Sequence, residues 1–165
     1  MSTTFQSGLY RTTVALPESP KSVPEARLVL VQMTNEHPHP VVVLPNGVTD
    51  NRWTFGNQGF LARDTEWLKT LVPLPRQGFY TLTRELEIGA GAKLPEGLLV
   101  QLGFTADGRP VIFPGQLMPG NSIQFASRGA LIGDLQLDFL KVNEFRVLAP
   151  PANAAAADVP ASNVN

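Results

Sequence analysis

The 165-residue sequence contains no cysteine, which excludes disulfide bonds, thiolate nucleophiles, cysteine-ligated zinc and iron–sulfur clusters. Charge is also scarce, since only 16% of the residues are Asp, Glu, Lys or Arg and the net charge is −1. Such a surface produces no field of one sign that could collect phosphates or anionic lipid from a distance. We therefore expect no membrane partner, and we do not expect nucleic acid to be the main partner.

Long apolar runs are absent as well. Val41–Leu44 and Leu98–Val100 are among the longest, and both are far shorter than the roughly 20 residues that span a bilayer. Residues 1–13 carry neither the basic start nor the apolar stretch of a secretory signal. We expect a protein that is not exported by a signal peptide.

Proline and glycine, by contrast, are frequent, with 15 and 14 residues spread along the chain. They divide the sequence into short segments, which is the pattern of many short strands and tight turns. The clearest turn is Asp107-Gly108, because Gly accepts a positive φ and Asp tolerates one. It lies between the apolar runs 98–104 and 110–113, and large apolar residues recur at every second position of the first run. These runs predict a central β-hairpin.

Further segments with β-branched or alternating apolar residues are predicted as strands around this hairpin. Residues 26–33 (ARLVLVQM) are apolar on both faces, which indicates a central strand covered on both sides. Turns are expected at 45–47, 56–59, 89–92 and 127–129, and the last is expected to join residues 122–126 and 130–132 in a further hairpin. The remaining predicted strands are residues 9–16, 41–44, 51–55, 79–88, 122–126, 130–132, 135–139 and 142–148.

Residues 64–72 (DTEWLKTLV) are the one segment with a helical pattern. Asp64 can accept a hydrogen bond from a free backbone N–H as the N-cap, and Trp67, Leu68 and Leu71 share one face at helical spacing. Pro73 ends the pattern. A helix of about two turns is too short to be stable alone, so we expect it to cover an open end of the sheet.

We therefore predict a mainly β fold, a small β-barrel or β-sandwich of about eight to ten short antiparallel strands with one short helix at about 64–72. Residues 8–148 are expected to form a single β-rich domain. Residues 1–7 are a polar N-terminal arm, and residues 149–165 are small, polar and proline-bearing, which predicts a flexible C-terminal arm. We expect both arms to be disordered or extended.

No motif in the sequence indicates catalysis or a cofactor. A serine nucleophile requires a G-x-S-x-G elbow, which the sequence does not contain. The carboxylates Glu85 and Glu87 lie on the exposed face of a predicted strand, where such residues serve solubility. His37 and His39 would point the same way from an extended segment, but two ligands make a weak metal site and no third is marked. We expect no enzyme, no cofactor and no bound metal.

One stretch mixes cations with aromatic rings, as sites for single-stranded nucleic acid do. Acidic neighbours dilute its positive charge, and packing of Trp53, Phe55 and Trp67 in a core beneath the helix is the favoured alternative. The candidate binding residues are Arg52, Trp53, Phe55, Phe60, Arg63 and Trp67.

A cysteine-free, nearly neutral, strand-rich domain flanked by polar arms is similar in composition and layout to capsid-decorating and tail components of bacteriophages. It is also similar to SH3-like small barrels. The first resemblance implies a non-enzymatic structural or assembly protein of a virion, which contacts other protein subunits and forms a homo-oligomer or a larger assembly. The second implies a small cytoplasmic adaptor that binds a protein or single-stranded nucleic acid. Arms without a core of their own often become ordered on a neighbouring subunit, which favours the first hypothesis.

Overall fold

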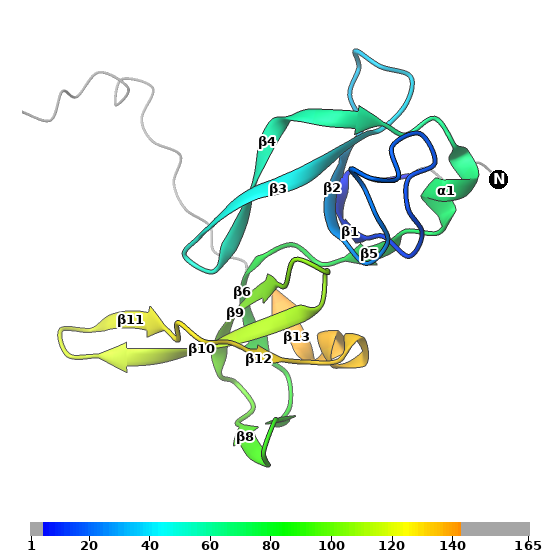
Figure 1. Cartoon of the computed structure of the whole chain (residues 1–165). Coiled ribbons are helices and arrows are strands. Elements are labelled where there is room, and N and C mark those ends of the chain that lie inside the picture. The colour runs from blue at the N-terminus through cyan, green and yellow to red at the C-terminus, as the bar shows by residue number, and fades with distance from the viewer. Residues whose placement is uncertain (1–4, 143–165) are drawn as a thin grey trace, which may run out of the picture.

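Two antiparallel β-sheets, each built from a continuous part of the chain, dominate the computed structural model, which describes residues 5–142 (Figure 1). Sheet 1 has the spatial order β4-β3-β2-β1-β5 and contains β1 (Gly8–Arg11), β2 (Leu28–Gln32), β3 (Val41–Thr49), β4 (Arg52–Leu61) and β5 (Val72–Leu74). Sheet 2 has the order β11-β10-β9-β6-β13, with β12 beside β10, and contains β6 (Gly78–Leu82), β9 (Leu99–Phe104), β10 (Pro110–Met118), β11 (Ser122–Phe125), β12 (Ala130–Leu131) and β13 (Leu140–Val142). A further hairpin joins β7 (Leu86–Ile88) to β8 (Ala92–Leu94), and the helical segments are α1 (Thr65–Lys69) and η1 (Asp134–Phe139).

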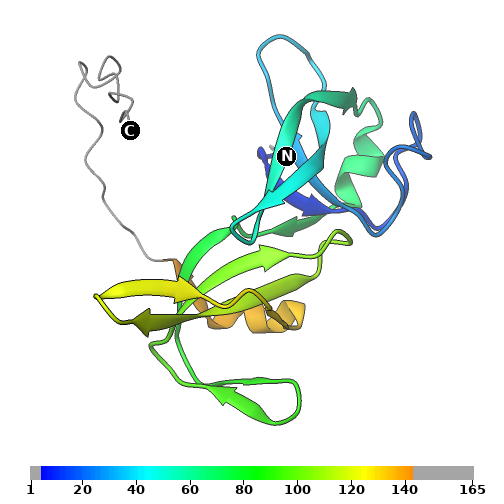
Figure 2. The ribbon, with the colours of Figure 1, turned by 60° about the vertical axis from the view of Figure 1, so that its left-hand side comes forward.

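The prediction of a mainly β fold with short antiparallel strands is confirmed, and the arrangement is that of a sandwich. Within residues 5–142 neither sheet closes on itself, since β4 and β5 are the edges of sheet 1 and β11 and β13 those of sheet 2. The facing sides of the two sheets share one apolar core, to which sheet 1 contributes Leu9, Leu28 and Leu74. Figure 2 shows the two sheets as separate layers.

The other face of sheet 1 is covered by α1 and by the long loop between β1 and β2. Leu16 of this loop and Trp67 of α1 are buried in a second core with Val29 and Val31 of β2, while Leu28 faces the first core. β2 therefore lies in the middle of its sheet with apolar residues covered on both faces, as its sequence predicts.

The predicted central hairpin is confirmed as β9 and β10. Gly108 has a φ of 78°, and its N–H donates to the carbonyl oxygen of Thr105 at 2.9 Å. The Thr105 N–H donates in turn to the carbonyl oxygen of Arg109 at 2.9 Å. Alternate residues of β9, Val100 and Leu102 among them, lie in the core between the sheets.

The predicted helix is present and its N-cap is confirmed. The Asp64 carboxylate accepts from the N–H of Glu66 at 2.9 Å and from that of Trp67 at 3.3 Å. α1 ends at Lys69, before the predicted residue 72, because Val72–Leu74 joins sheet 1 as β5 beside β1. Pro73 is compatible with this strand since β5 is an edge.

Two predicted turns are parts of strands instead. Residues 45–47 lie within β3 and residues 56–59 within β4, and the turn between these strands is Asp50-Asn51. The pairing shifts register on both sides of Pro45, and such bulges tolerate a residue without an N–H. Gly59 meets a spatial requirement, because a Cβ at this position would lie 2.8 Å from the carbonyl oxygen of Val42.

Other predictions for the C-terminal half are wrong. β11 and β12 do not form a hairpin across 127–129, since each pairs with β10. Residues 135–139 belong to η1 rather than to a strand, so the described chain has a second helical segment. The predicted strand 79–88 is interrupted between β6 and β7. Residues 143–148 and the C-terminal arm 149–165 lie outside the described residues.

Candidate functional site

The aromatic and basic residues that the sequence offered as a binding site lie on both faces of sheet 1. Trp67 is 3% exposed beneath α1, where its indole Nε1–H donates to the Val14 carbonyl oxygen at 2.9 Å. Phe60 packs against the same core. Packing beneath the helix, the favoured alternative for Trp67, is therefore what the structure shows.

The remaining residues of that set lie elsewhere. Trp53 and Phe55 pack against the core between the two sheets, not beneath the helix, and the Trp53 indole donates to the Phe104 carbonyl oxygen at 2.6 Å. The side chains of Arg52 and Arg63 are exposed. The structure thus divides the four aromatic residues between the cores on opposite faces of sheet 1 and does not assemble them into a single aromatic platform.

Apolar residues from several strands lie together on the outer face of sheet 2, the face that points away from the core. The residues of β9 that alternate with the core residues, Leu99 and Gln101, lie on this face, and so do Phe79 of β6 and Phe113 of β10, which both pair with Gln101. Phe79 is 39% exposed. The sequence alone gave no signal that strands so far apart in the chain would join their apolar residues here.

One end of this face is built by the turn of the β3–β4 hairpin. Asp50 and Asn51 both have positive φ, at 50° and 61°, which is the geometry of a two-residue hairpin turn. Gln101, only 4% exposed, donates from Nε2 to the Asp50 carbonyl oxygen at 2.7 Å and accepts from the Asn51 Nδ2 at 3.2 Å. Both the oxygen and the nitrogen of the Gln101 amide therefore help to fix the turn of sheet 1 on sheet 2.

Asn51 also compensates for a proline in β10. Ala126 donates its N–H to the Pro114 carbonyl oxygen at 3.1 Å, but Pro114 has no N–H to donate in return. The Asn51 Nδ2 donates to the Ala126 carbonyl oxygen at 3.2 Å instead. The turn of β3–β4 thus holds the base of the β10–β11 hairpin in place.

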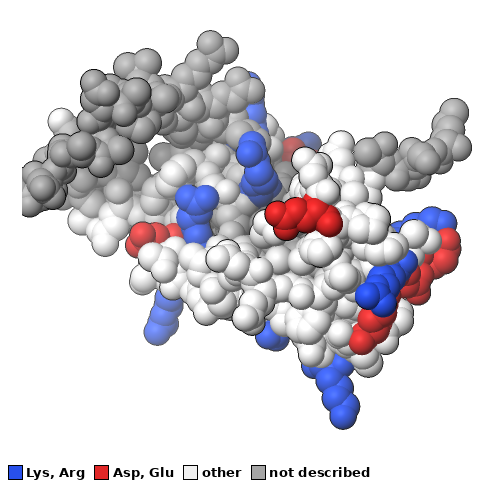
Figure 3. Space-filling view, turned by 90° about the horizontal axis from the view of Figure 1, so that it is seen from above, with Lys and Arg blue, Asp and Glu red and all other residues white. Residues whose placement is uncertain are grey.

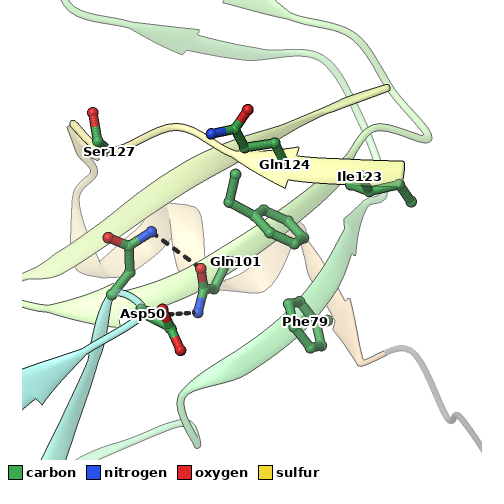
Figure 4. A pocket seen from close by; sticks show the side chains of 8 residues that line it. Asp50, Phe79, Gln101, Ile123, Gln124 and Ser127 are labelled. Atoms are coloured by element: carbon green, nitrogen blue, oxygen red, sulfur yellow. Dashed lines mark hydrogen bonds between the residues drawn. The ribbon is translucent and has the colours of Figure 1, made fainter. Parts of the chain in front are cut away.

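Between this turn and β11 lies an open groove of about 410 Å³ (Figure 4). Two aromatic rings, Phe79 and Phe125, stack in it with centroids 5.1 Å apart and an interplanar angle of 27°. Gly115 makes this possible, because a Cβ there would lie 3.3 Å from the Phe125 ring. The complete lining is Asp50, Asn51, Phe79, Gln101, Ile123, Gln124, Phe125 and Ser127.

The groove continues onto the β10–β11 hairpin, which projects from the body of the protein in both ribbon views (Figures 1 and 2). Leu117 and Ile123 are directly opposite each other on this hairpin and are 69% and 54% exposed. Residues 111–127 contain no Lys, Arg, Asp or Glu. We call the outer face of sheet 2 together with Leu117 and Ile123 the apolar surface.

Charged side chains lie outside the 111–127 stretch of the apolar surface. In Figure 3, which draws the molecule from above, Lys and Arg are interspersed with Asp and Glu, and no large region has one sign. A bidentate ion pair joins Arg11 of β1 to Asp134 of η1, with Nη1–Oδ1 at 3.1 Å and Nη2–Oδ2 at 2.6 Å. This hydrogen bonding from Arg11 lowers the pKa of Asp134. The ion pair lies away from the groove and serves to join the two halves of the chain.

The histidine pair does not form a shared site. A second hollow of about 270 Å³ is lined by His37 and Glu36, and His39 is not among its lining residues. The Thr34 hydroxyl, also in that lining, is buried and has no hydrogen-bond partner among residues 5–142. Within residues 5–142 no three His, Asp or Glu side chains gather closely enough to bind a metal ion. The same part of the chain contains no helix with the length and apolar character needed to cross a membrane.

Comparisons with models of protein families, with curated proteins and with solved structures find no match to this chain.

Proposed function

We propose that the chain is a non-enzymatic structural protein that acts by binding other protein subunits through the apolar surface. The observation that carries this proposal is the exposure of Leu117 and Ile123 side by side on a projecting hairpin without charge. Contiguous exposed apolar residues mark sites of interaction, and the centres of protein interfaces are poor in charge and rich in aromatic residues.

The groove supports binding rather than chemistry. It offers two stacked phenyl rings, a carboxylate at Asp50 and polar side chains at Gln124 and Ser127. Interfaces use such a combination of apolar centre and polar rim, and the proposed function needs no cofactor. The setting that we propose is a virion, as a capsid-decorating or tail-associated protein, because of the similarity in composition and layout described above.

Light scattering on the purified chain tests this function. We expect a homo-oligomer or larger assembly at micromolar concentration, and we expect the double variant Leu117→Ser/Ile123→Ser to be smaller. Leu135→Ser is the matched control, because Leu135 is 85% exposed but lies on η1, outside the apolar surface. A chain that stays monomeric at every concentration would contradict the proposal.

A second candidate is a small adaptor, and one observation favours it. In sheet 1 the last strand, β5, returns by way of α1 to pair with the first strand, β1. The strands β1 to β4 form a meander, and β5 is added to it beside β1. This order of strands is similar to the layout of SH3-like small barrels. The adaptor hypothesis predicts a monomer whose size the Leu117→Ser/Ile123→Ser variant does not change, so the same measurement separates the two functions.

A further inference from the structure

The edge of sheet 2 at β11 exposes backbone hydrogen-bonding groups. Within the described structure β11 pairs only with β10. The Ala126 N–H donates to the Pro114 carbonyl oxygen, so Ala126 and Pro114 form a hydrogen-bonded pair. In an antiparallel ladder such pairs alternate with non-hydrogen-bonded ones, so the next hydrogen-bonded pairs are Gln124–Gln116 and Ser122–Met118. The N–H and C=O groups of Ile123 and Phe125, which alternate with these, consequently point away from β10 toward the open edge.

The edge strands β4, β5 and β13 carry features that block the addition of a strand. β5 contains Pro73, and β13 contains the exposed Lys141. On β4 the edge at Trp53 is occupied by the Gln77 side chain, whose Oε1 accepts from the Trp53 N–H at 2.7 Å and whose Nε2 donates to its carbonyl oxygen at 3.1 Å. β11 (SIQF) has no charge and no proline. Charges, prolines and covering groups are the usual protection of sheet edges, and β11 lacks the protection that β4, β5 and β13 carry.

We propose that β11 pairs in antiparallel fashion with β11 of a second copy of this chain. Sheet 2 of one copy and sheet 2 of the other then form one continuous sheet. This inference rests on the proposed function and names its partner. Ile123 of each copy would exchange backbone hydrogen bonds with Phe125 of the other, and the two-fold axis would pass beside Gln124. Since the same strand serves both sides, the contact is isologous and closes at two copies.

Charge favours a second copy as the occupant. Two identical surfaces always bring like charges together when the surface carries a net charge, and each such contact is unfavourable. Residues 111–127 carry none, so two copies meet there without repulsion. Their apolar surfaces would then become continuous across the axis, with Leu117 and Ile123 of each copy near the centre.

The absence of cysteine makes a precise test possible, because a single introduced thiol is unique. In the proposed pairing Gln124 faces Gln124 of the second copy in a non-hydrogen-bonded pair, with Cα atoms about 4.5 Å apart. This separation lies within the range of about 4.4–6.8 Å that a disulfide requires. We expect Gln124→Cys to form a disulfide-linked dimer under mild oxidation, measured on a non-reducing gel.

Gln116→Cys is the matched control. Gln116 is exposed and pairs with Gln124, but it lies one strand further from the axis. The two Gln116 Cα atoms would be roughly 14–16 Å apart, from the spacing of neighbouring strands, which is too far for a disulfide. We also expect Ile123→Lys to raise the concentration at which the dimer dissociates at least about tenfold, and Leu135→Lys to leave it unchanged.

The outcomes separate this inference from the proposed function. A disulfide in Gln124→Cys but not in Gln116→Cys, with dissociation of Ile123→Lys, supports the β11 pairing. An oligomer in which neither cysteine cross-links, or both do equally, overturns the pairing and leaves the proposed function standing. A chain that is monomeric at every concentration overturns both. Far-ultraviolet circular dichroism confirms that each variant is folded.

Discussion

Gly108 shows how a single residue decides the central hairpin. Its φ of 78° lies in the left-handed region, and a Cβ there would come within 3.0 Å of the Arg11 side chain. We expect Gly108→Val to destabilise the protein by more than about 1 kcal/mol, because of backbone strain and crowding. Urea unfolding measures this. Gly89→Val is the control, since an added Cβ at Gly89 meets nothing within 4 Å. An equal effect of both variants would contradict this role of Gly108.

The burial of the aromatic residues in the candidate binding set could be predicted for Trp67 but not for Trp53 and Phe60. The helical spacing of Trp67 predicted its burial, which the structure shows. Trp53 and Phe60 lie on opposite faces of β4, and this follows from their odd and even positions in one continuous strand. The turn expected at 56–59 would interrupt that alternation, so the sequence alone does not separate the two rings.

α1 shows how an element of marginal length is maintained. It has five residues, too few for stability in isolation. The Asp64 carboxylate satisfies two of its free N–H groups, and the Glu18 carboxylate in the β1–β2 loop accepts from the Asp64 N–H at 3.1 Å. We expect Asp64→Ala to lower the free energy of unfolding by about 0.5–2 kcal/mol. Thermal unfolding checks this, with the exposed Asp138→Ala as the control. Equal melting temperatures for the two variants would show that the cap contributes nothing.

Elements whose signals are local could be predicted, and elements that depend on distant partners could not. The Asp107-Gly108 turn and the Asp64 cap act on backbone groups a few residues away. Gly59, by contrast, resembles a turn residue in sequence but is required by Val42 on the neighbouring strand. η1 similarly begins at Asp134, which binds Arg11 at the other end of the described chain. No pattern within a short window contains such information.

At the scale of the whole molecule, two aspartates connect stability to pH. Hydrogen bonding from Arg11 lowers the pKa of Asp134, and hydrogen bonding from Thr105 lowers the pKa of Asp107. A carboxyl whose pKa is lower in the folded than in the unfolded state stabilises the fold above the unfolded value, about 3.9. This contribution is lost as the pH falls through the folded pKa.

We therefore expect Asp134→Asn to weaken the dependence of the free energy of unfolding on pH below about 4. At neutral pH the loss should be no more than about 1 kcal/mol, because the Asp134 side chain is 51% exposed and solvent screens the pair. Urea unfolding at several pH values between 3 and 7 measures both effects. An acid dependence equal to that of the unmodified chain would show that the ion pair does not contribute to stability.

The candidate site depends on the whole molecule, which explains why it could not be predicted from the sequence. Phe79 and Phe125 meet only because β9 and β10 lie between their strands in a fixed register. Gln101 is buried by a turn that belongs to the other sheet. The one signal present in the sequence was the stretch 111–127 without charge, which indicates an exposed apolar hairpin once that hairpin is known to project.

The continuity of each sheet in sequence has a consequence for synthesis on the ribosome. Every strand of sheet 1 is complete by Leu74, so this half can fold while the rest is still being made. Residues 75–142 take about 3–14 s to follow, at roughly 5–20 residues per second. During that interval Leu9, Leu28 and Leu74 have no covering sheet. The nascent chain is therefore expected to expose an apolar face for seconds, and chaperone binding should concentrate in that interval.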